Sequence, residues 1–176
     1  MQGGVERLNK PIIMTATMGN ADFAWADAQR RQYFPSERNF LAAHITLFHH
    51  LPPQALDEIL NLVKATVKNS APPKTLLQEP MHLGRGVAYK LYSPELLGIR
   101  AEFAESFHGL LTRQDQQTPR LHITVQNKVS AKESKALFDQ LSNEFEPRPF
   151  TISGLAIHYY LDGPWQEIGN WKFRGN

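Results

Sequence analysis

Two short segments of the chain carry the same pattern of chemically useful side chains. Residues 44–47 read His-Ile-Thr-Leu, and residues 122–125 read His-Ile-Thr-Val. Histidine takes up or releases a proton near neutral pH, and a threonine hydroxyl donates a hydrogen bond to an anion. Chance alone gives about 0.4 His-x-Thr triplets in a chain of this composition, and the matched isoleucines make two such triplets less expected still. The repeat therefore predicts one site that uses both segments.

Both segments read as β-strands, at residues 44–51 and 120–129. Successive side chains of a strand point to opposite faces, so His44 shares a face with Thr46. His122 likewise shares a face with Thr124 and, two residues further on, with Gln126. Alternate positions are roughly 6.6 Å apart, so an imidazole and a hydroxyl of one strand can reach the same tetrahedral anion.

Side by side, two such strands would surround one phosphate with two imidazoles and two hydroxyls. One histidine would take a proton from water while the other gives a proton to a leaving oxygen. The threonines would donate hydrogen bonds to the non-bridging phosphate oxygens as charge builds up on them. This chemistry requires neither a metal nor a covalent intermediate. The spacing predicts phosphodiester hydrolysis by a pair of acid–base histidines.

The elements that must position these residues follow from apolar periodicity and turn residues. We expect strands at 11–18, 44–51, 74–83, 86–93 and 120–129, and two or more strands after residue 149. Helices are expected at 22–33, 52–69, 94–111 and 130–145, with Asn20 or Asp22 capping the first and Ser130 the last. The helix at 52–69 should bury one face, formed by Leu56, Ile59, Leu60, Val63 and Val67. The helix at 94–111 should bury Leu97, Ala101, Ala104, Phe107 and Leu111.

The two halves of the chain match in the order of their elements. Each has a helix, a motif strand, a second helix and a pair of strands, which indicates an internal duplication. No long linker separates the halves, so we expect an α+β fold with two pseudo-symmetric lobes of one domain. That domain would span residues 11–176 behind a lead-in segment of residues 1–10.

The composition limits the classes of function. The 176 residues contain no cysteine, which excludes disulfides and thiolate ligands and agrees with a cytoplasmic location. No apolar run approaches the length that spans a membrane, and the N-terminus does not resemble a signal peptide. The net charge of +2 argues against bulk coating of nucleic acid but allows a small anion held by a few donors. We expect a monomer.

The surroundings of the two motifs point to a family. ERNFLAAHITLFHHLPP (37–53) and LTRQDQQTPRLHITVQNKV (111–129) resemble the 2H phosphoesterases, and among them the bacterial members of the 2′-5′ RNA ligase-like group. The resemblance covers about residues 11–174. It implies two antiparallel-type sheets with outer helices and an active-site cleft between them. It also implies opening of a 2′,3′-cyclic phosphate on RNA 3′ ends or small cyclic nucleotides to a 2′-phosphate, with 2′-5′ RNA ligation in some members and no cofactor.

The resemblance also assigns roles by motif position. It makes His44 and His122 the proton-transfer pair, and Thr46 and Thr124 the residues that hold the phosphate. It favours His122 as the base for water and His44 as the acid, although the residues themselves leave either assignment open.

Other residues near the motifs are candidates for contacts with substrate. Phe48 is in phase with His44 and would either stack on a base or fill the wall of the cleft. Arg85, Arg113 and Arg120 are candidate phosphate contacts, and Gln126 extends the second motif. Four aromatic residues near the expected cleft are either core residues or base platforms: Tyr33, Phe34, Tyr89 and Trp165.

Three alternatives remain open at this point. His49 and His50, together with His44, suggest a metal cluster, although no carboxylate has matching ligand spacing. The same cleft could serve a non-catalytic RNA- or nucleotide-binding module. A third alternative is an enzyme of the same superfamily that acts on ADP-ribose cyclic phosphate or on 2′-5′ oligonucleotides.

Overall fold

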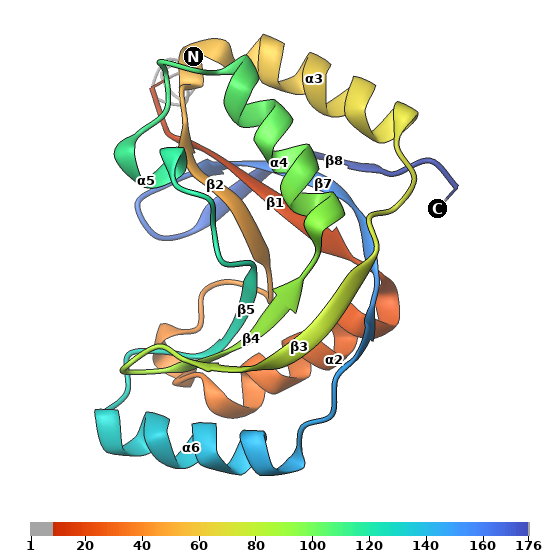
Figure 1. Cartoon of the computed structure of the whole chain (residues 1–176). Coiled ribbons are helices and arrows are strands. Elements are labelled where there is room, and N and C mark those ends of the chain that lie inside the picture. The colour runs from red at the N-terminus through yellow and green to blue at the C-terminus, as the bar shows by residue number, and fades with distance from the viewer. Residues whose placement is uncertain (1–8, 176) are drawn as a thin grey trace.

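The frame of the molecule is a pair of four-stranded antiparallel sheets (Figure 1), seen in a computed structural model that describes residues 9–175. The first sheet has the order β2-β1-β7-β8, and the second has the order β5-β4-β3-β6. The strands are β1 (Ile12–Met18), β2 (Ile45–Leu51), β3 (Thr75–His82), β4 (Val87–Tyr92), β5 (His122–Gln126), β6 (Arg148–Phe150), β7 (Ile152–Tyr160) and β8 (Trp165–Lys172). The helices are α2 (Asn20–Tyr33), α3 (Leu56–Asn69), α4 (Pro94–Ser106), α5 (Arg113–Gln116) and α6 (Ala131–Glu144), with short 3₁₀ turns η1 (Ser36–Arg38) and η2 (Pro53–Ala55). The predicted α+β class with two pseudo-symmetric lobes is confirmed.

The two lobes are not the two halves of the chain. The sequence places the hairpin of β3 and β4 at the end of the first half, but this hairpin forms the centre of the second sheet. The last long strands, β7 and β8, return to the first sheet beside β1. Each sheet therefore contains strands from both halves, so the chain crosses repeatedly between the two lobes.

The helices cover the sheets in the same interleaved way. α3 packs against β7 and β8, and α6 packs against β3 and β4, while α2 crosses over to contact β5 of the opposite lobe. Figure 1 shows α3 and α4 at one end of the molecule and α2 and α6 at the other. The buried face of α3 is formed by Ile59, Val63 and Val67, as its periodicity predicts. No helix within residues 9–175 is both long and apolar enough to cross a membrane.

The predicted core face of the helix at 94–111 is confirmed at Phe107 but lies one position away from the fully buried face of α4, and of its other residues Leu97, Ala104 and Leu111 are partly buried. The buried residues are Leu96, Arg100, Phe103 and Phe107, whereas Ala101 is exposed. The helix also ends at Ser106, and a separate turn of helix, α5, follows it before the second motif. The error arises because a charged residue, Arg100, occupies the centre of the buried face.

Of the two predicted helix caps, the one on α6 is confirmed and the one on α2 is wrong. Ser130 Oγ accepts a hydrogen bond from the backbone N–H of Glu133 at 3.1 Å, which confirms the predicted cap of α6. The cap position of α2 is Gly19, so neither predicted side chain caps that helix. The Asp22 carboxylate instead accepts hydrogen bonds from Thr151 N–H and from Arg148, each at 2.7 Å, which ties α2 to the link between β6 and β7.

Candidate active site

The two motif strands occupy equivalent places in the two sheets. β2 is an edge strand of the first sheet and β5 is an edge strand of the second, and the two strands contact each other. An edge strand has one row of backbone groups without a partner strand. The duplicated motifs are brought together where the two lobes meet, and side chains from other elements can bond the outer backbone groups of both strands.

The two motif histidines are held in the same way. Nδ1–H of His44 donates to the carbonyl oxygen of Ala42 at 2.8 Å, and Nδ1–H of His122 donates to the carbonyl oxygen of Arg120 at 2.6 Å. A carbonyl oxygen only accepts, so the proton of each neutral ring lies on Nδ1. Nε2 of each ring then carries a lone pair, as a proton-transfer group requires.

A β-bulge follows the threonine of each motif. In β2, Thr46 pairs with Thr15 and Phe48 pairs with Met14, so Leu47 is an extra residue. In β5, residues 124 and 126 pair with residues 88 and 87, so Val125 is extra in the same way. A bulge shifts the alternation of side chains by one residue. The strand pattern that predicts the faces of His and Thr therefore fails directly after Thr.

Two predicted substrate contacts are turned inward for this reason. Phe48 is fully buried and Gln126 is only 7% exposed, and neither lines a pocket that contains a motif residue. Phe48 packs in the core, which is the alternative to base stacking. The residues that follow them, His49 and Asn127, line the pockets next to the motifs instead.

The motif residues combine crosswise in two pockets. A pocket of about 490 Å³ is lined by His44 and by Thr124 of the other motif. A pocket of about 270 Å³ is lined by His122 and by Thr46. The two rings line different pockets, but they are near enough that a positive charge on His122 opposes protonation of His44. Each half of the site thus takes its histidine from one lobe and its threonine from the other.

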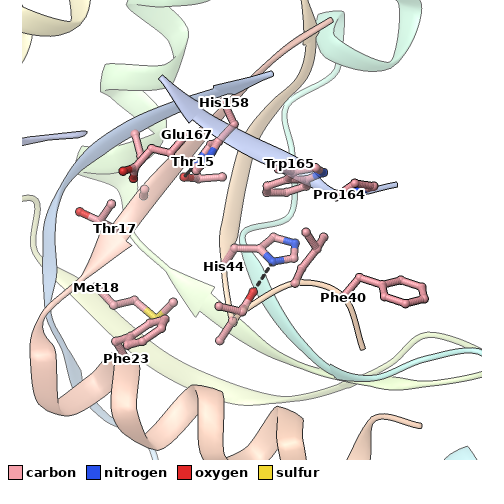
Figure 2. Close-up of a pocket in the computed structure, with 15 residues that line it drawn as sticks. Thr15, Thr17, Met18, Phe23, Phe40, His44, His158, Pro164, Trp165 and Glu167 are labelled. Atoms are coloured by element: carbon pink, nitrogen blue, oxygen red, sulfur yellow. Dashed lines mark hydrogen bonds between the residues drawn. The ribbon is translucent and has the colours of Figure 1, made fainter. Parts of the chain in front are cut away.

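Aromatic side chains surround His44. Figure 2 shows a further pocket in which His44 lies next to Trp165. The volume of this pocket is about 400 Å³. The ring centroids of His44 and Trp165 are 4.6 Å apart. Phe40, which is 70% exposed, lies at the rim of this pocket and of the 490 Å³ pocket. Trp165 is therefore at the site, as the sequence allows, and Phe40 is an additional aromatic residue that the sequence does not single out.

His44 lies in an environment that favours its neutral form. The pKa of His44 is lowered to about 4, mainly by burial; the hydrogen bond to Ala42 opposes this shift, and the charges of Arg30, His122 and His158 add to it. Burial also lowers the pKa of His49 from its ordinary value, with Asp115 acting in the opposite direction. At neutral pH His44 is thus uncharged, with Nε2 ready to accept a proton.

Acidification should destabilise the protein through His44. Its pKa falls from 6.5 in the unfolded chain to about 4 in the folded protein. Between these values the unfolded chain binds a proton that the folded protein does not, so the free energy of unfolding decreases as the pH falls through this window. The shift corresponds to on the order of 3 kcal/mol. Denaturant unfolding at about pH 4.5 and pH 7 should show a smaller pH effect in His44→Gln than in the unchanged protein; an equal effect would contradict this role of burial.

Asp115 lines the smaller pocket, and the sequence did not predict a role for it. Its carboxylate accepts the backbone N–H of His49 at 2.9 Å and of His50 at 2.7 Å, on the free edge of β2. Asp115 is 1% exposed and belongs to α5, which begins at the cap residue Thr112. The only sequence signal is a threonine three residues before an aspartate in the polar loop.

Some of the remaining predicted residues line the two motif pockets, and others lie outside them. Arg120 lines the smaller pocket, whereas Arg85 and Arg113 are exposed and line neither pocket. Tyr33 and Tyr89 lie in a separate pocket beside α6, so they are not at the candidate site. Phe34 lines the 490 Å³ pocket but is 7% exposed.

Two arginines that sequence reasoning assigned no role also reach the site. Arg30 of α2 lines the larger pocket, and Arg100 of α4 lines the smaller one. Nothing in residues 9–175 groups three His, Asp or Glu side chains as a metal site would, so His44, His49 and His50 do not form the cluster considered from the sequence.

The comparisons with known proteins agree with the observed fold. The model of the 2′-5′ RNA ligase superfamily matches residues 20–164. The crystal structure of TT0787 of Thermus thermophilus has a TM-score of 0.63 at 16% identity, covering 94% of this chain and 99% of that chain. E. coli LigT complexed with 3′-AMP has a TM-score of 0.57 at 14% identity, covering 93% and 98%, and LigT complexed with NADP⁺ has 0.60 at 14%, covering 94% and 98%. At this identity the likeness is one of fold. A comparison with curated protein sequences gave no match.

Proposed function

Because this chain belongs to the 2′-5′ RNA ligase superfamily, the 2H phosphoesterases, we propose that it hydrolyses 2′,3′-cyclic phosphates on RNA 3′ ends or small nucleotides to 2′-phosphates. One observation carries the proposal: His44 shares a pocket with Thr124, and His122 shares a pocket with Thr46. A phosphate at the junction of these pockets would meet a histidine and a threonine on each side.

The reaction is a single in-line displacement at phosphorus. Water oxygen forms a bond to phosphorus while the bond from phosphorus to O3′ breaks. Neutral His44 takes a proton from the water at Nε2, and protonated His122 gives a proton to O3′. The products are a 2′-phosphate and a free 3′-hydroxyl, and solvent restores the protons on the two rings. The lowered pKa of His44 supports this assignment of base and acid, which is the reverse of the one that the family resemblance favours.

The threonines act on the charge that develops during this displacement. The hydroxyl groups of Thr46 and Thr124 would donate to the non-bridging oxygens from opposite sides. Such donors matter most in the transition state, where these oxygens carry the largest negative charge.

The nucleoside would lie on the aromatic side of the site. Phe40 and Trp165 line both pockets that contain His44, and exposed aromatic rings stack on bases of any sequence. The exposed position of Phe40 supports this role, because burying a large apolar ring against a base is favourable.

A substrate panel tests the proposal. Nucleoside 2′,3′-cyclic phosphates, an RNA ending in a 2′,3′-cyclic phosphate, ADP-ribose cyclic phosphate and a 2′-5′ oligonucleotide are incubated with the protein in excess chelator, and products are identified by phosphorus NMR. The proposal expects a 2′-phosphate from the first two substrates. Tight binding of 2′-phosphate ends without turnover would indicate a binding module instead. Adding an RNA with a free 5′-hydroxyl tests 2′-5′ ligation in the same assay.

The organisation as one domain over residues 11–176, the monomeric state and the cytoplasmic location remain predictions from the sequence. The lead-in segment of residues 1–10 lies almost entirely outside the described residues.

A further inference from the structure

Two arginines are buried at the centre of this protein. Arg30 of α2 is 4% exposed, and Arg100 of α4 is 5% exposed. A charged side chain is rarely so buried without a partner of opposite charge. The contacts of the two guanidinium groups therefore indicate why they are retained.

Arg30 reaches across to the motif strand of the other lobe. Its Nη1–H donates to the carbonyl oxygen of Thr124 in β5 at 3.1 Å, and its Nε–H donates to Asn39 Oδ1 at 2.7 Å. The guanidinium carbon lies 4.1 Å from the centroid of the Phe34 ring. Arg30 thus fixes the backbone at the threonine of the second motif while it lines the pocket that contains His44.

Arg100 makes an equivalent contact with β2, the motif strand of the first half of the chain. Its Nε–H donates to the carbonyl oxygen of Leu47, the bulge residue of β2, at 3.2 Å. Its Nη2–H donates to the backbone oxygen of Asp115 at 2.5 Å, and the guanidinium carbon lies 4.1 Å from the Phe48 ring centroid. Arg100 lines the pocket that contains His122.

The positive charges of the two groups are not neutralised locally. All four hydrogen-bond acceptors are uncharged carbonyl oxygens, and neither arginine forms an ion pair in the described part of the chain. Burial lowers the pKa of both guanidiniums, and Asp27 and Asp115 raise it only from beyond ion-pair distance. The Asp115 carboxylate is instead bound to the backbone of β2. The two pockets are therefore each lined by a buried cation that has no ion-pair partner in the described part of the chain.

We propose that Arg30 and Arg100 are a reciprocal pair of positioning residues: each holds the motif strand of the opposite half of the chain and provides positive charge for the phosphate bound between them. This inference rests on the proposed function for the identity of the anion. It explains why α2 crosses to β5, and why a charged residue lies at the centre of the buried face of α4. It also accounts for the stability of a bulge at an edge strand, since the bulged carbonyl of Leu47 is bonded to Arg100.

The test separates the charge of each arginine from its ability to donate hydrogen bonds to two acceptors at once. Arg30→Gln and Arg100→Gln remove the charge, whereas Arg30→Lys and Arg100→Lys keep it but cannot bridge two acceptors with a planar fork. The matched control is Arg31→Gln, on the same helix, because Arg31 is exposed and its ion pair within residues 9–175 is a loose one, with Asp27 at 3.7 Å. For each variant, kcat and KM are measured on a nucleoside 2′,3′-cyclic phosphate, binding of inorganic phosphate and adenosine 2′-monophosphate is measured by calorimetry, and Tm reports folding.

The glutamine variants should bind both phosphates about tenfold more weakly and lose about 10²-fold in kcat. The lysine variants should bind phosphate nearly as the unchanged protein does but still lose about tenfold in kcat, because the motif strand is no longer fixed. Arg31→Gln should match the unchanged protein in every readout. Because the lysine variants keep the charge, they test positioning even if a glutamine variant does not fold.

Lysine variants with unchanged kcat would overturn the positioning role, and glutamine variants with unchanged phosphate affinity would overturn the role of charge. A lowered Tm with unchanged kinetics and binding would likewise overturn the proposal. Failure of the proposed function looks different, because the unchanged protein itself would then turn over no cyclic phosphate.

Discussion

Replacing His44 or His122 with alanine should remove turnover of a 2′,3′-cyclic phosphate and leave the fold intact. Each ring has its Nδ1–H bound to a backbone carbonyl, so each offers Nε2 for one of the two proton transfers. Loss of either transfer should lower kcat by at least about 10³-fold. Initial rates measured by phosphorus NMR, with circular dichroism as a check of folding, test this expectation.

His108→Ala is the matched control for these variants. His108 is an exposed histidine in the turn after α4 and lines none of the pockets that contain the motif residues. The double variant of His44 and His122 should lose little more than either single variant, because residues that act as one unit are strongly non-additive. If either single variant keeps a tenth of the normal rate, the paired acid–base chemistry is wrong.

Replacing Thr46 or Thr124 with valine should lower kcat by about 10²-fold and leave KM nearly unchanged. Valine keeps the shape of threonine and removes only the hydroxyl, so the change acts on the hydrogen bond to a non-bridging oxygen. The two variants should be affected alike, since each threonine faces the histidine of the other motif. Steady-state kinetics on a nucleoside 2′,3′-cyclic phosphate measures both constants.

The control for the threonine variants is Thr151→Val, at an exposed position between β6 and β7. It should leave both constants unchanged. A rise in KM with unchanged kcat in Thr46→Val or Thr124→Val would mean that the hydroxyl binds substrate and transition state equally, against its proposed role.

The sequence singles out the four motif residues by their types and spacing, but it does not predict how they combine. Two-residue spacing in a strand gives the histidine and threonine of each motif a common face, whereas in the structure His44 shares a pocket with Thr124 and His122 shares a pocket with Thr46. The same alternation places Phe48 and Gln126 on that face, but the bulges at Leu47 and Val125 turn both inward. A bulge depends on the pairing of one strand with another, so the residues of one strand do not reveal it.

The two buried arginines could not be predicted for a different reason. Periodicity assigns charged residues to the solvent face of a helix, so the expected face of α4 excludes Arg100 and shifts by one residue. Arg30 is hidden in the same way, among the polar residues of α2. Their burial depends on carbonyl oxygens of distant strands, and these contacts exist only once the lobes have been assembled.

The architecture, too, is predictable where it depends on local sequence and not where it depends on long-range pairing. The two strands of the β3–β4 hairpin are predicted at 74–83 and 86–93 from their own residues. In the turn between them Gly84 has a φ of 86°, and Gly86 lies so close to β5 that a Cβ would be 2.0 Å from the carbonyl oxygen of Gln126. The sheet to which this hairpin belongs is set by its long-range pairing with β5 and β6, which no local pattern contains. Local elements were therefore predictable, and the interleaving of the lobes was not.

The central claim is that two imidazoles from different sheets act on a single phosphate, although each ring lines its own pocket. A crystal structure of the protein with bound adenosine 2′-monophosphate tests it most directly. We predict one phosphate group with Nε2 of His44 and Nε2 of His122 both within about 3 Å of its oxygens. A phosphate bound by one ring alone, or two nucleotides bound separately at the two rings, would contradict it.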